Sequence, residues 1–180
     1  MGERKFLLKE AEDLMSEYRK KISHFIEIIN EDSEHLREYS NLIVFDGRNL
    51  VDDTIIGTVV SIAISTRRFI EKNKPLVGMA NSDDGTVKIS SRGTPALIAN
   101  GLDLGTALRE AVEAIGSQAE GGGHNIAAGA RIPQGTEQLL IENLNDALEK
   151  QQKSKELKEV KETKKTTTKI NKKVTTDKKR

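Results

Sequence analysis

The stretch GGGHNIAAGARIP, residues 121–133, is central to the fold of this chain. Its second half, AAGARIP, alternates apolar residues with small or charged ones, and this alternation predicts a strand over 127–133. The three glycines before it allow two interpretations. They form either a flexible turn with an exposed histidine, or a backbone cradle whose N–H groups approach an anion because no Cβ intervenes.

Segments on either side of this stretch predict further strands and a helix. LDLGTALREAVEAIG (102–116) predicts a helix with Asp103 as its N-cap and Gly116 as its end. Residues 75–93 predict a β-hairpin around the turn signal SDDG, and the apolar run in 41–47 predicts a buried strand.

Two more helices are predicted within the same domain. Residues 52–70 predict a helix with Asp52 or Asp53 as its N-cap, although their β-branched content leaves a strand as the alternative. Another helix begins at about Gln134, and its apolar stripe is predicted to include Leu139, Leu140, Leu144 and Leu148.

The N-terminal segment predicts one long amphipathic helix over 4–30, followed by a charged connection or short helix. Its length corresponds to a rod of roughly 40 Å, which either lies along the body or reaches towards another domain. Apolar residues recur along it at intervals of three or four: Leu7, Ala11, Leu14, Tyr18, Ile22, Phe25 and Ile29.

The resulting fold class is α/β (α+β), a mixed β-sheet covered by helices. We expect three parts: the long helix and charged connector at 1–40, the α/β domain at 41–150, and a Lys/Thr-rich tail at 151–180. The tail is predicted to be disordered because its composition buries too little apolar surface to offset ordering.

Charge is divided unevenly along the chain. Residues 150–180 contain thirteen of the 29 Lys/Arg and four of the 28 Asp/Glu, which leaves 1–149 with sixteen basic and twenty-four acidic side chains. An acidic body with a basic tail differs from a dedicated nucleic-acid binder, whose folded domain has the basic face. Nucleic-acid affinity of the body therefore requires a local patch, and the tail can add a salt-sensitive contribution.

Composition also bears on localisation. The chain has no cysteine, no apolar signal-peptide region in MGERKFLLKE, and no apolar run long enough for a membrane span. These features predict a cytoplasmic protein, and the family resemblance described below implies that it is nucleoid-associated.

Residues for metal or nucleophilic catalysis are scarce. The chain has three histidines, His24, His35 and His124, and its paired aspartates at 52–53 and 83–84 are explained as a helix cap and a turn. No zinc, two-metal or Ser-His-Asp pattern is present. We expect no catalytic residues, no metal site, no cofactor and no enzymatic activity.

A second candidate anion site is KISSRG, Lys88 to Gly93, at the end of the hairpin. An arginine at a strand end beside serines can clamp a phosphate with two hydrogen bonds. The alternative is an ordinary surface arginine at a strand edge.

Taken together and in this order, GRNLVDDTIIGTVVSIA, VKISSRG, GLDLGTALREA and GGGHNIAAGARIP resemble the DHH-associated domain. That domain is the C-terminal, nucleic-acid-binding lobe of RecJ-type DHH phosphoesterases, and the resemblance covers about residues 41–148. The resemblance implies that Ser90 and Arg92 contact phosphate groups. It also implies that His124 is a hydrogen-bond donor on the substrate side. The implied backbone cradle consists of Gly121, Gly122 and Gly123.

The sequence departs from that family in one respect. The catalytic lobe, with its DHH motif and metal-binding aspartates, is absent, and the helix at 4–30 is similar to the one that connects the two lobes. The resemblance to archaeal RecJ-like proteins therefore implies a noncatalytic subunit of the DNA replication machinery. Its implied partners are GINS subunits, indirectly the MCM helicase, and single-stranded DNA, with no membrane partner.

Two alternatives stay open. The chain is the substrate-binding half of a split or truncated DHH-family nuclease, or it is a free-standing module that binds oligonucleotides.

Overall fold

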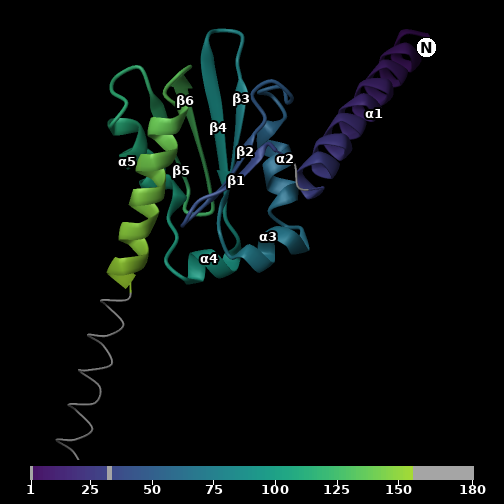
Figure 1. Ribbon diagram of the computed structural model, residues 1–180. Coiled ribbons are helices and arrows are strands. Elements are labelled where there is room, and N and C mark those ends of the chain that lie inside the picture. The colour runs from purple at the N-terminus through teal and green to yellow at the C-terminus, as the bar shows by residue number, and fades with distance from the viewer. Residues whose placement is uncertain (1, 32–33, 156–180) are drawn as a thin grey trace, which may run out of the picture.

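A computed structural model describes residues 2–31 and 34–155 (Figure 1). Within them, six strands form one mixed sheet with the order β1-β2-β3-β4-β6-β5. Strands β2 and β3 run parallel, and the other neighbours are antiparallel. The strands are β1 (Leu36–Glu38), β2 (Ile43–Asp46), β3 (Leu76–Asn81), β4 (Thr86–Arg92), β5 (Glu120–Gly123) and β6 (Ala127–Pro133). The predicted mixed sheet with helices is confirmed.

Helices pack on both faces of the sheet, because strand residues alternate between two hydrophobic clusters. One cluster joins the sheet to α5 (Leu104–Glu113) and to a helix over residues 137–155. The other joins β1–β3 to α2 (Ile56–Ala63), α3 (Arg67–Lys72) and the C-terminal end of α1 (Gly2–Asn30). A short helix, α4 (Pro95–Ala99), follows β4.

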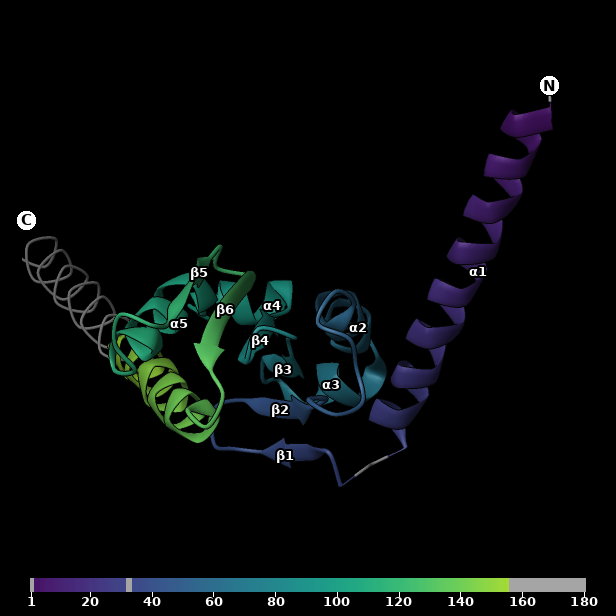
Figure 2. The same ribbon diagram turned by 90° about the horizontal axis from the view of Figure 1, so that it is seen from above.

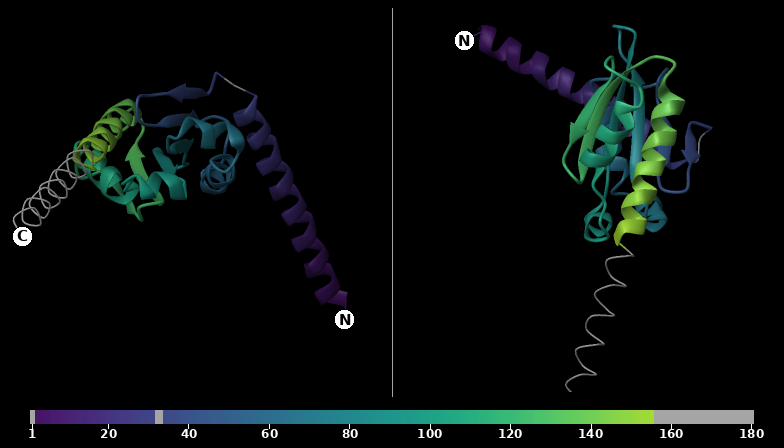
Figure 3. Two further views of the ribbon diagram at one scale, coloured as in Figure 1. Left: turned by 90° about the horizontal axis from the view of Figure 1, so that it is seen from below. Right: turned by 90° about the vertical axis from the view of Figure 1, so that its left-hand side faces the viewer.

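The long helix α1 projects from the body (Figures 2 and 3). Its last turns pack on α2, and Ile29 there is completely buried. Further towards the N-terminus the same apolar stripe is uncovered, with Leu7 and Leu14 each 62% exposed. Of the two predicted arrangements, the helix reaching away from the body is the one observed.

Local signals predicted three elements well. Asp103 caps α5 by accepting a hydrogen bond from the Thr106 N–H, and Gly116 follows the helix with a φ of +101°. The hairpin turns at residues 82–85, where Gly85 has a φ of +79°. The strand predicted over 127–133 is β6.

Four predictions were wrong in detail. The segment 52–70 contains two helices, because Thr66 adopts an extended conformation between α2 and α3. Neither Asp52 nor Asp53 caps α2, whose N-cap is Ile55. The charged connector contains β1, which pairs with β2.

The fourth error concerns the helix over 137–155. Leu139 was predicted to belong to the apolar stripe but is 43% exposed. Ile141 is buried next to Leu140 in its place. The helix also continues through residue 155, beyond the predicted start of the tail at 151. The predicted disorder of the remaining tail lies outside the described residues.

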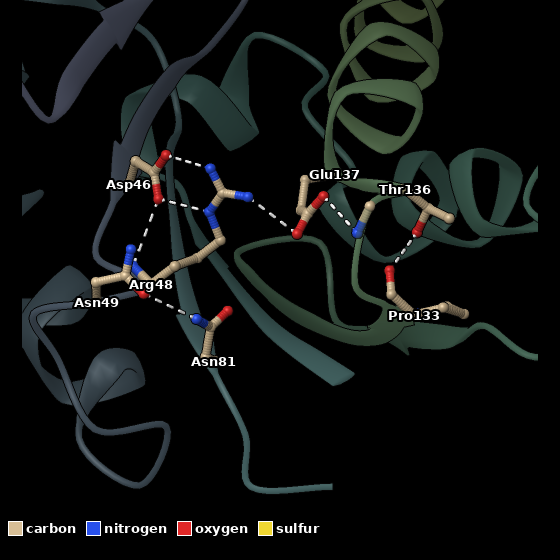
Figure 4. A network of polar contacts seen from close by, with 8 residues as sticks. Asp46, Arg48, Asn49, Asn81, Pro133, Thr136 and Glu137 are labelled. Atoms are coloured by element: carbon tan, nitrogen blue, oxygen red, sulfur yellow. Dashed lines mark hydrogen bonds and ion pairs between the residues drawn. The ribbon is translucent and has the colours of Figure 1, made fainter. Parts of the chain in front are cut away.

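A polar network fixes this helix to the sheet (Figure 4). Arg48 donates two hydrogen bonds to the carboxylate of Asp46, of 2.8 and 2.7 Å, and its Nη1 lies 3.0 Å from Oε1 of the buried Glu137. The hydrogen bonds from Arg48 hold the pKa of Asp46 below its usual value. The end of β2 is thereby tied to the first turn of the helix.

Candidate functional site

Half of one sheet face is left without a helix over it. The hydrophobic cluster beneath α2 and α3 contains no residue of β4, β5 or β6. On this face β4 and β6 present their polar, small and charged residues, since the alternate residues point into the other cluster. We call this surface the open face; it comprises Lys88, Ser90, Arg92, Gly122, Ala127, Gly129 and Arg131.

A row of small residues crosses the sheet at this surface. Gly78 of β3 pairs with Ser90, Ser90 with Gly129, and Gly129 with Gly122. α2 lies directly over Gly78, where a Cβ would come within 2.4 Å of Val60 Cγ2. Gly129 and Gly122 lie beyond α2, and because they have no side chains their backbone is accessible to a ligand.

Two adjoining hollows occupy the open face. The larger, of about 570 Å³, lies between α2 and the row, and its lining includes Gly57, Ser61, Ser90, Arg92, Gly122 and Gly129. The second, of about 450 Å³, is lined by Glu120, Gly121 and Arg131 and shares Lys88, Gly122 and Gly129 with the first. Together they form a continuous depression across β4, β6 and β5.

Arg92 is the central charge of the larger hollow. Its Nε donates to Ser61 Oγ at 2.8 Å, and its Nη1 donates to Ser90 Oγ at 3.2 Å and to the Ser91 carbonyl at 2.8 Å. Among the described residues no carboxylate pairs with it. Burial therefore lowers the pKa of the guanidinium, since no negative charge compensates the lost hydration. An anion bound in the hollow would supply that compensation.

The serines around Arg92 orient it. Ser61 Oγ donates to the Gly57 carbonyl at 2.7 Å while it accepts from Arg92, so α2 fixes the plane of the guanidinium. Ser90 is 5% exposed and accepts from Arg92. In this arrangement Ser90 positions the arginine, and the guanidinium is the group presented to a ligand.

The other cations of the open face differ in their pairing. Arg131 lies 2.9 Å from Asp84 Oδ2 and 3.9 Å from Asp53 Oδ2, so its charge is largely matched. Lys88 has no ion pair among the described residues. Lys88 and Arg92 are thus the cations of this face without an ion pair among the described residues, and the carboxylate of Glu120 lies in the lining of the second hollow.

The glycine run forms the edge strand β5 and is neither a turn nor a loop. Close packing requires a glycine at position 123 of this strand. A Cβ on Gly105 of α5 would lie 2.3 Å from the Gly123 carbonyl oxygen, and one on Gly123 would lie 2.6 Å from Ala127 O. Gly123 also has a φ of +146°, which a residue with a side chain rarely adopts.

The structure brings most of the predicted site residues together. Ser90, Arg92, Gly122 and Gly123 line the larger hollow, and Gly121 lines the second. His124 follows β5 in a turn closed by its N–H to the Ala127 carbonyl at 2.8 Å. Its side chain is exposed and is not among those that line either hollow.

Sequence reasoning missed the contributions of other elements. Gly57 and Ser61 come from α2, which only the fold places beside β4. The position of Lys88 was predictable from the sequence. Lys88, Ser90 and Arg92 alternate with the buried Val87 and Ile89, so all three lie on the same face of the strand.

Among the described residues, no three His, Cys, Asp or Glu side chains are grouped closely enough to hold a metal ion. None of the described helices is long and apolar enough to span a membrane.

This chain is similar to a known domain family and to a known archaeal protein. The family model of the DHHA1 domain matches residues 41–154. An uncharacterized protein of Methanocaldococcus jannaschii is 28% identical over 145 residues, which are 80% of this chain and 29% of that protein.

Two solved structures share the fold. RecJ from Thermus thermophilus, in complex with Mg²⁺, has a TM-score of 0.56 at 16% identity and covers 80% of this chain and 20% of its own. Cdc45 from Entamoeba histolytica has a TM-score of 0.58 at 10% identity, with 73% and 28% covered. The chain spans less than a third of the length of each of these three relatives. Since the DHHA1 model matches well over half of its residues, the chain belongs to the DHHA1 domain family.

Proposed function

We propose that this protein is a noncatalytic, RecJ-like subunit of the archaeal DNA replication machinery that binds GINS and holds single-stranded DNA on its open face. The observation that carries the DNA-binding part is the guanidinium of Arg92, partly buried, oriented by two serines and unmatched by any carboxylate among the described residues. Such a group is suited to a phosphate oxygen.

The remaining features of the open face favour the backbone of a single strand over its bases. None of the six aromatic residues of the chain lies between residues 86 and 133, so the strands β4, β5 and β6 provide no platform for base stacking. The small residues of the row let a sugar-phosphate backbone approach closely. Binding is therefore expected to be insensitive to sequence and strongly dependent on salt.

The partner part of the proposal rests on other observations. The family membership and the likeness to RecJ and Cdc45 folds support a role in nucleic-acid metabolism. The body is acidic outside the open face, and α1 exposes a group of apolar side chains, which suits a protein contact. These side chains are Phe6, Leu7, Leu8, Leu14 and Met15.

Reconstitution tests the GINS partnership and the noncatalytic role. The full chain is mixed with purified GINS from the same organism and followed by size-exclusion chromatography with light scattering. In parallel, a labelled single-stranded oligonucleotide is incubated with the chain and Mg²⁺ or Mn²⁺. Co-elution and an intact oligonucleotide are expected. Separate elution would contradict the GINS partnership, and hydrolysis that Arg92→Ala abolishes would contradict the noncatalytic role.

A second candidate function follows from the lengths of the relatives. Since each of them has much further chain, this protein could serve as the substrate-binding half of a DHH-family nuclease whose catalytic lobe lies elsewhere. In that case, adding the DHH lobe would produce metal-dependent hydrolysis. Arg92→Ala and His124→Ala would then reduce that activity.

A further inference from the structure

Arg109 lies beside the glycine strand β5, the edge strand of the sheet farthest from α2, and it is not among the residues that line either hollow. A Cβ built on Gly122 would lie 3.5 Å from Arg109 Cγ and 3.6 Å from its Nη1. Arg109 belongs to α5, which packs on β5 from the opposite face of the sheet. Because β5 is the edge strand, an exposed side chain from α5 can extend along that edge.

The guanidinium of Arg109 is oriented but not neutralised by a direct ion pair. Its Nη2 donates to Thr106 Oγ1 at 3.0 Å, and among the described residues no carboxylate lies within ion-pair distance of it. The nearby carboxylate of Asp103 is occupied by the N–H and hydroxyl of Thr106 at the start of α5. The Thr106 N–H is the main cause of the lowered pKa of Asp103, and the charge of Arg109 contributes less.

Arg92 and Arg109 therefore lie near the two ends of the small-residue row beyond Gly78. In that part of the row Ser90 is buried and Gly129 is exposed. Ser90, Gly129 and Gly122 are successive partners on β4, β6 and β5. At roughly 4.8 Å between neighbouring strands, the row spans about 10 Å. Lys88 lies along it and lines both hollows. The larger hollow thus has the guanidinium of Arg92, Lys88 lines both hollows beside the carboxylate of Glu120 in the second, and Arg109 lies beside the edge strand β5.

We propose that Arg109 is a second phosphate contact and that a single strand crosses β4, β6 and β5 from Arg92 to Arg109. This inference rests on the proposed binding of single-stranded DNA and adds a direction and a minimum length to it. A stacked strand rises about 3.4 Å per nucleotide, so a span of about 10 Å corresponds to roughly three nucleotides. Oligonucleotides of four or more nucleotides engage both arginines, whereas a dinucleotide engages one.

Salt-dependent binding tests this proposal with the full chain. Fluorescence anisotropy measures the affinity of a labelled oligothymidylate decamer over a series of salt concentrations, and competition measures the affinity of unlabelled thymidine dinucleotide. The variants are Arg109→Ala, Arg109→Lys and Arg92→Ala. Arg67→Ala is the matched control, because it removes the same charge from an arginine that is 91% exposed and paired with Glu71 on α3.

Arg109→Ala is expected to weaken decamer binding about tenfold, the loss of one charged hydrogen bond. It should also reduce the slope of log K against log salt by roughly 0.7, one phosphate contact on a single strand. Dinucleotide affinity should stay unchanged, and Arg109→Lys should retain the slope.

Two results would overturn the inference. If Arg92→Ala weakens the decamer while Arg109→Ala matches Arg67→Ala, the path to Arg109 is wrong and the proposed function stands. If neither Arg92→Ala nor Arg109→Ala differs from Arg67→Ala, the proposed function and the inference both fail.

Discussion

The Nε of Arg92 donates a hydrogen bond to Ser61 Oγ over 2.8 Å, and this bond joins the last residue of β4 to α2. This contact fixes the orientation of the Arg92 side chain at the end of the strand. Without α2 the guanidinium would have only the serines of its own strand as partners.

Replacing Ser61 by alanine should therefore weaken oligonucleotide binding by roughly threefold to tenfold, less than Arg92→Ala, since the hydrogen bonds to Ser90 and Ser91 remain. Anisotropy titration measures the effect. Ser65→Ala is the matched control on the same segment, because the Ser65 hydroxyl donates to the Ser61 carbonyl and Ser65 does not line either hollow. An effect of Ser65→Ala as large as that of Ser61→Ala would argue against the positioning role.

Two glycine-to-alanine changes separate stability from binding. In Gly105→Ala the new Cβ meets backbone atoms of Gly123 at 2.3 and 2.8 Å, so we expect a loss of about 3 kcal/mol in unfolding free energy. In Gly57→Ala the nearest atom is the Ser90 hydroxyl at 3.3 Å, which can rotate, and Arg92 Nη2 at 3.6 Å is next. Gly57→Ala should keep the stability and weaken binding. Urea denaturation and anisotropy measure both, and equal destabilisation by the two changes would contradict this prediction.

Arg48→Ala should destabilise the fold by about 2 kcal/mol, because the buried Glu137 and the partly buried Asp46 both lose their cation. The matched control is Arg67→Ala, whose exposed ion pair is worth at most about 0.5 kcal/mol. Urea denaturation of both variants at neutral pH gives the comparison. A loss for Arg48→Ala no larger than that of the control would refute the stabilising role of the network in Figure 4.

Acid should weaken the attachment of β1. Hydrogen bonds from Lys72 and then Lys74 lower the pKa of Glu38 from 4.5 to about 2. Because the pKa is lower in the folded state, Glu38 contributes stability above pH 4.5, and this is lost as the pH falls towards 2. Glu38→Gln should be less stable than the wild type at pH 7, with the difference shrinking by pH 2. A difference that is constant with pH would contradict the shift.

The sequence predicts those elements that are determined by nearby residues, and it does not predict those that depend on pairing with a distant segment. The cap at Asp103, the turn at Gly85 and the alternation over 127–133 are local, and each predicted its element correctly. The three-residue strand β1 is too short to show a period, and it exists through its pairing with β2. The glycines of β5 have no side chains to alternate, so their strand is recognisable only from its partner β6.

The same distinction applies to the site. Ser90 and Arg92 lie within one strand, and the motif around them was visible in the sequence. Ser61 lies 31 residues before Arg92, and Arg109 lies on a helix of the opposite layer. Their proximity to the open face follows from the order of the strands and from the packing of α2 and α5. No spacing in the sequence encodes it.

The central claim is that DNA binds on the open face and not merely on the basic residues near the C-terminus. Amide chemical-shift mapping of the ¹⁵N-labelled full chain, titrated with a single-stranded oligothymidylate, tests it most directly. Shifts are expected at the amides of Ser61, Ser90 and Gly129, and they should disappear in Arg92→Ala. Shifts confined to residues 156–180, or unchanged in Arg92→Ala, would contradict it.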